Sequence, residues 1–150
     1  MRESKFRGFN RKNGVWLYGF YLQKRWSSES SAESNSSTAE SRQSSAKANR
    51  GAHFVCPDEF AEGKSWDDYE IDPKTRGEYT GQKDKNGREI YEGDVVATVV
   101  NGCRYVQEVV WSDVTNGFSF RSNGCGPIFH KPSCMEVIGN IHDNPELLEQ

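Results

Sequence analysis

Three Asn-Gly pairs restrict the fold of this chain more than any other feature. They are Asn13-Gly14, Asn101-Gly102 and Asn116-Gly117. Asn-Gly is a strong short-range hairpin signal, because a type I′ turn needs a positive φ angle at both central residues. Apolar and β-branched stretches flank the pairs, and helical periodicity is almost absent. The sequence therefore predicts a mainly β chain built from antiparallel hairpins.

The remaining strands and their ends follow from the same kind of pattern. We expect strands over residues 6–9, 15–22, 52–56, 69–71, 95–100, 103–111, 118–122 and 135–142. Asp72-Pro73 predicts a turn after the fourth of these strands. At the end of the chain, Asn144 can cap a short helix that begins with Pro145. Many short antiparallel strands usually curl into a small, partly open barrel, which is the fold class we expect.

The second arm of the first hairpin is unusual because both of its faces are apolar. Residues 15–22 alternate Val, Leu, Gly and Tyr on one face with Trp, Tyr, Phe and Leu on the other. Such a strand is predicted to be covered on both sides or to pack against a neighbour. Gly8 and Gly19 predict bulges or a close approach of another backbone.

A serine-rich tract divides the chain. Residues 27–50 contain no aromatic residue and no aliphatic side chain larger than alanine. Such a segment cannot offset an ordering entropy of about 1–2 kcal/mol per residue, so we interpret it as a flexible insertion. The expected organisation is a hairpin over residues 1–26, the insertion, and a barrel with a C-terminal helix over residues 51–150. Together they would form one domain.

Charge is distributed unevenly along the chain. Residues 1–26 hold seven basic residues and one acid, whereas residues 56–94 hold twelve acids and six bases; the net charge is −3. We expect the two segments to pair with each other in the fold. The alternative is a nucleic-acid-binding hairpin in which basic side chains lie beside aromatic rings for base stacking. Its binding surface would consist of Lys5, Arg7, Arg11, Lys12, Trp16 and Tyr18.

The stretch Asp84–Gly87 has the oxygen side chains and glycine of a calcium loop. If Gly87 is the sixth position of such a loop, the first position is the neutral Gln82 and the twelfth is Gly93, where a bidentate acid is required. The calcium interpretation therefore fails. The same residues suit a polar turn in which Asp84 and Asn86 bond the local backbone and Gly87 supplies a positive φ angle.

Metal or thiol chemistry has only weak support in the sequence. The four cysteines are Cys56, Cys103, Cys125 and Cys134, and the histidines are His53, His130 and His142. No two cysteines have the two-residue spacing of a zinc knuckle, and no local signature pairs a cysteine with a histidine. We expect reduced thiols, no metal and no cofactor. The N-terminus lacks the apolar segment of a signal peptide, and no stretch is long enough to span a membrane.

Three blocks of sequence resemble the YopX-like family of phage and prophage proteins. They are Lys5-Phe6-Arg7, Tyr79 to Asp94 and Ile138 to Leu148, and together they extend over the whole chain. The positions that carry the resemblance, to which we assign structural roles, are Tyr79, Gly81, Asp84, Asn86, Gly87, Tyr91, Gly93, Asp94, Gly139, Asn140 and Pro145.

The resemblance implies a β-barrel fold and suggests roles for part of the second block. Tyr79 and Tyr91 are expected to anchor a loop against the barrel. Glu92-Gly93-Asp94 is expected to turn the chain into the following strand, as in small SH3-like barrels. The serine-rich insertion departs from the family pattern.

The family also implies a phage-derived protein in the cytoplasm of a bacterial host, without established activity. We therefore expect a non-enzymatic module that binds a protein or a nucleic acid and does not bind membranes; self-association is possible. Nucleic-acid binding through the hairpin is the first alternative. A thiol- or metal-dependent enzyme is the second.

Overall fold

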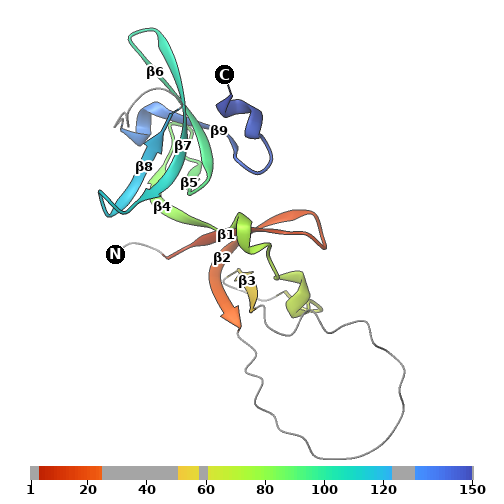
Figure 1. Ribbon diagram of the computed structural model, residues 1–150. Helices are drawn as coiled ribbons and strands as arrows, with labels where there is room; N and C mark the ends of the chain where they lie inside the picture. Colours follow the sequence, from red (N-terminus) through yellow and green to blue (C-terminus); the bar gives the residue numbers. More distant parts are fainter. Residues whose placement is uncertain (1–3, 25–50, 58–60, 123–130, 150) are drawn as a thin grey trace, which may run out of the picture.

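The structure, a computed structural model, describes residues 4–24, 51–57, 61–122 and 131–149. Its strands form two antiparallel sheets (Figure 1). Across the first sheet the order is β3 (Ala52–Cys56), β2 (Val15–Lys24), β1 (Phe6–Asn10), β4 (Gly77–Lys83) and β5 (Glu89–Tyr91). Across the second it is β8 (Gly117–Arg121), β7 (Cys103–Ser112), β6 (Asp94–Val100) and β9 (Met135–Asn140). The mainly β prediction is confirmed.

Helical structure within the described ranges is limited to single 3-10 turns. These are η1 (Trp66–Asp68), η2 (Pro73–Thr75), η3 (Pro132–Cys134) and η4 (Pro145–Leu148). The predicted C-terminal helix is therefore only the turn η4, and the Asn144 side chain makes no capping hydrogen bond. The Asn144 side chain instead lies against Gly139, where a Cβ atom would be 2.6 Å from its Oδ1.

The hairpins form where Asn-Gly predicts them, but their turns differ. Asn101 and Gly102 have φ angles of 51° and 82°, as the predicted type I′ turn requires. At the first hairpin, Gly14 is left-handed and Asn13 is not, so a type I′ turn is the wrong prediction there. Asn10 explains the difference: its Oδ1 accepts from the Asn13 amide, which holds a longer loop. At the third, Asn116 alone is left-handed.

The strands β1, β2 and β3 form the N-terminal lobe of the molecule. The segment of residues 69–75, called the strap below, connects two of these strands. On one side it bonds β3, with Tyr69 O accepting from Val55 N and Ile71 N donating to His53 O. On the other side it bonds β1, through Asp72 N and the Thr75 hydroxyl, both with Phe9. The predicted strand 69–71 is therefore wrong: a single bridge between Phe54 and Glu70 forms before the chain turns away.

Closure of this lobe requires glycine at two positions. A Cβ atom on Gly8 would lie 2.4 Å from Cδ1 of Ile71, a strap residue that fills the interior. A Cβ atom on Gly19 would lie 1.9 Å from the carbonyl oxygen of Cys56, and the φ angle of Gly19 is 152°. The predicted close approach of another backbone is confirmed at Gly19, whereas at Gly8 the close atoms belong to the Ile71 side chain. Gly19 is the buried residue of β2, and its neighbours on the same face, Leu17 and Tyr21, are half-buried.

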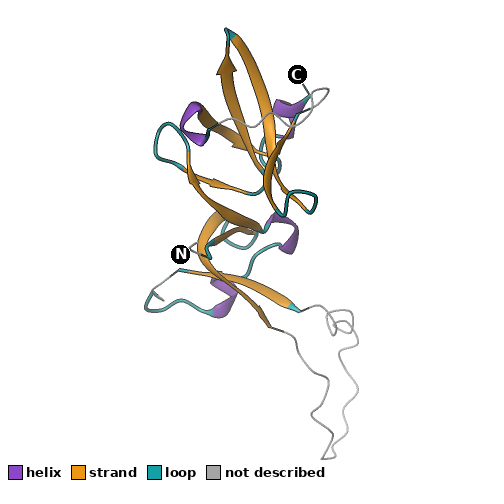
Figure 2. Ribbon diagram, turned by 90° about the vertical axis from the view of Figure 1, so that its left-hand side faces the viewer, coloured by secondary structure: helices purple, strands orange, loops and turns teal. Residues whose placement is uncertain are grey.

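The main core lies between β5 and the second sheet. Ile90 of β5 packs with a cluster of buried side chains from all four strands of that sheet: Val96, Val109, Phe120, Met135 and Val137. Figure 1 shows β4 and β5 between the lobe of β1–β3 and the sheet of β6–β9, and Figure 2 shows from the side that the strands form two parts. The sheets are linked but not closed into one barrel, so the SH3-like closure is not confirmed.

Candidate functional site

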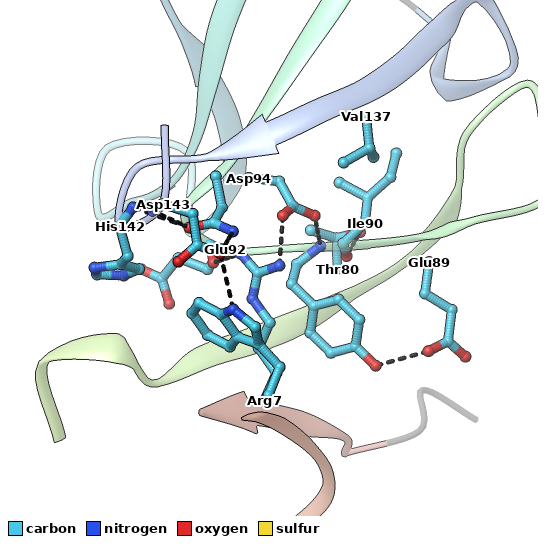
Figure 3. Close-up of polar contacts among 12 residues, drawn as sticks. Arg7, Thr80, Glu89, Ile90, Glu92, Asp94, Val137, His142 and Asp143 are labelled. Carbon is cyan, nitrogen blue, oxygen red and sulfur yellow. Dashed lines mark hydrogen bonds and ion pairs between the residues drawn. The ribbon is translucent and has the colours of Figure 1, made fainter. Parts of the chain in front are cut away.

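A buried ion pair connects the two sheets. Arg7 on β1 and Asp94 at the start of β6 are 2.5 Å apart between Nη1 and Oδ1, and their side chains are 4% and 1% exposed (Figure 3). Burying two charges is expensive unless each is held in good geometry. The residues around this pair, which we call the joint, are therefore the first place to look for function. The joint consists of Arg7, Trp16, Tyr91, Asp94 and Asp143.

Arg7 lies between two aromatic rings. Its guanidinium carbon is 5.0 Å from the ring centre of Trp16 and 5.3 Å from that of Tyr91. Nη2 also donates to the carbonyl oxygen of Glu92 at 3.2 Å. A Cβ atom on Gly77 would lie 2.4 Å from that same oxygen and 3.4 Å from Nε of Arg7. A larger residue at position 77 would therefore displace both the guanidinium and its acceptor.

Asp94 receives a second contact from the neighbouring backbone. Its Oδ2 accepts from the Tyr91 amide at 2.8 Å. Burial raises the pKa of Asp94, while the Arg7 charge and the Tyr91 amide act in the opposite direction. This bond joins the end of β5 to the start of β6, as expected for Glu92-Gly93-Asp94 turning the chain into the strand. Gly93 has a φ angle of 81° in this turn.

The segment that follows β9 contributes Asp143 to the joint, where this residue contacts the Trp16 indole. Nε1 of Trp16 donates to Oδ2 of Asp143 at 2.9 Å, and Nδ2 of Asn140 donates to the same oxygen at 2.8 Å. Oδ1 of Asn140 in turn accepts from the amides of His142 and Asp143. Burial and the Arg7 charge lower the pKa of His142, whose ring lies 5.9 Å from that of Trp16.

Tyrosines extend the joint along the first sheet. The Tyr91 hydroxyl donates to Glu89 at 2.6 Å, and Glu89 pairs with Lys5 at 2.9 Å. Burial and this carboxylate raise the pKa of Tyr91, so the phenol stays protonated. The rings of Tyr18 and Tyr79 each lie 5.5 Å from that of Tyr91. Tyr79 and Tyr91 thus contact each other within the first sheet, and their predicted role as anchors of a loop stays a prediction.

Asp84 closes the edge of the second sheet instead of binding calcium. Its Oδ1 accepts from the amides of Asn86 and Arg88, and its Oδ2 accepts from the Val137 amide of β9 at 3.0 Å. Burial raises the pKa of Asp84, but these amide donors outweigh it, so the net pKa is lowered. Gly81 and Gly87 both have φ angles of 81° and shape the hairpin around it.

Replacing Asp84 with asparagine tests this edge contact. We expect D84N to lower the free energy of unfolding at pH 7 by about 1–3 kcal/mol, because an amide nitrogen would then face a buried N–H donor. Since the folded pKa is depressed, the wild-type advantage is present above the unfolded pKa of about 3.9 and disappears as the pH falls through the folded value. Urea titrations between pH 3 and 7 measure the difference. A constant gap over that range would contradict the assignment.

The basic residues proposed for nucleic-acid binding are occupied within the fold. Lys5 and Arg7 belong to the ion pairs described above, Arg11 pairs with Asp72, and Lys12 lies 3.4 Å from Asp68. Each of the four carboxylates comes from the acidic segment 56–94. The predicted surface also contains two aromatic residues. The Trp16 indole donates a hydrogen bond to Asp143, and the Tyr18 side chain is 43% exposed.

The sequence did not single out the outward face of β2. Tyr18, Phe20 and Leu22 are 43%, 52% and 47% exposed and follow one another on this face; we call them the apolar row. The predicted packing against a neighbour is met at Tyr18, whose ring lies 5.5 Å from that of Tyr91, whereas Phe20 and Leu22 remain exposed. The signal was present in the sequence as apolar residues on both faces of one strand.

Among the residues that the structure describes, there is no site for the thiol or metal alternatives. Cys56 is buried, which raises its pKa and opposes reactivity, whereas Cys103 and Cys134 are exposed. Cys125 and His130 lie outside the described residues. No three His, Cys, Asp or Glu side chains within those residues are arranged to hold a metal ion. In the same part of the chain, no helix has the length and apolar character needed to cross a bilayer.

Comparisons with known proteins agree with the sequence blocks and with the fold. A family model described as YopX protein matches residues 5–149. The crystal structure of protein EF1440 from Enterococcus faecalis is similar, with a TM-score of 0.53 and 23% identity over 99% of each chain. At this identity the similarity shows the fold alone. A search of curated proteins finds no match.

Proposed function

The chain belongs to the YopX family, and we propose that it is a non-enzymatic protein that binds a protein partner through the apolar row on β2. As the family resemblance implies, it would act as a phage or prophage accessory protein in the cytoplasm of the host. The observation that carries the proposal is the exposure of Tyr18, Phe20 and Leu22, three large side chains that follow one another on one face of β2.

The row is unusual because a strand with one covered face normally presents polar residues to water. Here three large side chains follow one another on the solvent side of β2. Contiguous exposed apolar surface of this kind commonly marks a protein interface. Both edges of β2 are already paired, with β1 and β3, so a partner would contact the side chains rather than add a strand.

Charge favours a protein over a nucleic acid as the partner. Counterion release requires basic side chains that can reach phosphates. Lys5, Arg7, Arg11 and Lys12 are instead engaged with carboxylates. Binding of Arg7 to a phosphate would break its buried ion pair with Asp94 and leave the Asp94 carboxylate without a partner. The net charge of −3 further weakens attraction to a polyanion.

Two variants test the row. The double variant Phe20→Ser/Leu22→Ser should abolish capture of specific proteins from a lysate of the lysogenic host. Its control is Val99→Ser, because Val99 is an apolar strand residue that is 65% exposed on β6, in the other sheet. Quantitative mass spectrometry of the captured proteins is the readout. The proposal fails if the double variant captures the same proteins as the wild type, or if Val99→Ser loses them equally.

A further inference from the structure

Two polar side chains lie inside the core of the second sheet. Gln107 on β7 and Thr98 on β6 are 0% and 1% exposed. Gln107 lies directly opposite Val96 of the core cluster, and Thr98 lies directly opposite Met135 of the same cluster. Residues that face each other across antiparallel strands share one side of the sheet. Both polar side chains therefore point into the core and not toward solvent.

The polar atoms of these two side chains have no hydrogen-bond partner in the part of the chain that the structure describes. They are Oε1 and Nε2 of Gln107 and Oγ1 of Thr98. A buried donor or acceptor in this position has lost the hydrogen bonds that it made to water in the unfolded chain. In native proteins such groups are nearly always paired with the protein or with ordered water. These atoms therefore indicate a site whose hydrogen bonds are completed by a small molecule.

The three atoms belong to neighbouring positions of the sheet. Val96 pairs with Gln107 and Thr98 with Tyr105, so Thr98 and Gln107 are diagonal neighbours across β6 and β7. Diagonal neighbours of this kind are separated by about 7–8 Å along the backbone, and long side chains reach across part of that gap. The two side chains do not bond each other. A molecule placed between them can therefore contact both.

The chemistry of these atoms selects water as that molecule. The Gln107 amide offers one donor group and one acceptor, and the Thr98 hydroxyl can act as either. A buried water molecule typically makes about three hydrogen bonds to otherwise unpaired polar groups, which matches the number of atoms available here. None of these atoms carries a charge, so none of them would offset the cost of burying an ion.

We infer that the core of the second sheet binds one ordered water molecule between Gln107 and Thr98. The water donates to Oε1 of Gln107, accepts from Nε2 of the same amide and bonds Oγ1 of Thr98. It thereby completes the hydrogen bonds of both side chains within an apolar core. The site lies in the second sheet and contains no residue of the apolar row, so it can fail while the proposed function stands.

Magnetisation transfer between water and the protein tests the site in the full ¹⁵N-labelled wild-type chain. We expect NOE and ROE cross-peaks of opposite sign between water and the side-chain amide protons of Gln107, as for a water molecule that tumbles with the protein. The control is Gln82, which is exposed near the end of β4 and should show only short-lived hydration. A Gln107 amide without a long-lived water cross-peak would overturn the inference.

Thr98→Val separates bound water from the exchanging proton of the Thr98 hydroxyl. Valine has nearly the shape of threonine but no hydroxyl, and the water keeps its bonds to the Gln107 amide. The cross-peak at Gln107 should therefore remain in this variant. Its loss would show that the signal came from the hydroxyl proton, and the inference would fall.

A double-mutant cycle tests whether the two side chains share one water molecule. Gln107→Met keeps most of the side-chain length and removes the amide. In urea titrations, Thr98→Val/Gln107→Met should lose less stability than the sum of the two single variants, because each single change already weakens the shared contact. Additive losses would refute the bridge. A direct hydrogen bond between the side chains would produce coupling without a water cross-peak, which also overturns the inference.

Discussion

Replacement of Arg7 by methionine is expected to lower the free energy of unfolding by about 3–5 kcal/mol, because it leaves the Asp94 carboxylate buried without its partner. Methionine retains much of the length that packs between Trp16 and Tyr91, so the loss reports the charge more than the volume. Urea denaturation followed by tryptophan fluorescence and circular dichroism measures it. Coincident transitions by the two probes justify a two-state treatment.

The control for Arg7 is an exposed arginine in the same hairpin. Arg11 is 74% exposed in its pair with Asp72, so Arg11→Met should lower the stability by less than about 1 kcal/mol. The double variant Arg7→Met/Asp94→Leu removes both buried charges and should recover part of the loss. A small effect of Arg7→Met, similar to that of Arg11→Met, would show that the joint does not stabilise the fold.

Gly19→Ala is expected to be the most damaging of the single-methyl substitutions. The new Cβ atom would lie 1.9 Å from the Cys56 carbonyl oxygen, a backbone atom that cannot rotate away, and the φ angle of 152° is unfavourable for alanine. Overpacking and strain each contribute about 1–3 kcal/mol, so we expect a loss of roughly 3 kcal/mol or more. The pairing of β2 with β3 should weaken first, which hydrogen exchange at Phe54, the partner of Leu22 across the two strands, would detect.

A second glycine provides the control for this substitution. Gly117 also lies in a strand, but a Cβ atom there would approach nothing closer than the Thr115 carbonyl oxygen at 3.8 Å. Gly117→Ala should therefore change the stability by no more than about 0.5 kcal/mol. If the two alanine variants had equal stability, the tight contact between β2 and β3 would be refuted.

Four of the family-signature positions make contacts between separate parts of the fold. Asp94 and Tyr91 surround Arg7, Asn140 orders the segment that receives Trp16, and Asp84 occupies the edge of β9. The resemblance identified these positions before their contacts were known. It did not locate the apolar row, because Phe20 and Leu22 lie outside the matching blocks.

The features that the sequence alone predicted depend mostly on residues that are close together in the chain. Alternating apolar residues and Asn-Gly pairs determined the hairpins, because side-chain direction along a strand and positive φ angles depend on neighbouring residues alone. Counting positions in the loop after Gln82 likewise excluded calcium. Opposite charges in segments 1–26 and 56–94 predicted pairing between them, although not which residue would meet which.

The tertiary structure alone decided which residues are buried and which are exposed. From the sequence, Arg7 is expected to be a surface charge in a basic hairpin. In the structure it is buried, because β4, β5 and β6 bring Tyr91 and Asp94 to it. The sequence pattern predicts Phe20 as a covered residue, yet its side chain is 52% exposed. Burial arises from contacts between segments distant in the chain, and no local pattern can specify which of two apolar faces those contacts will cover.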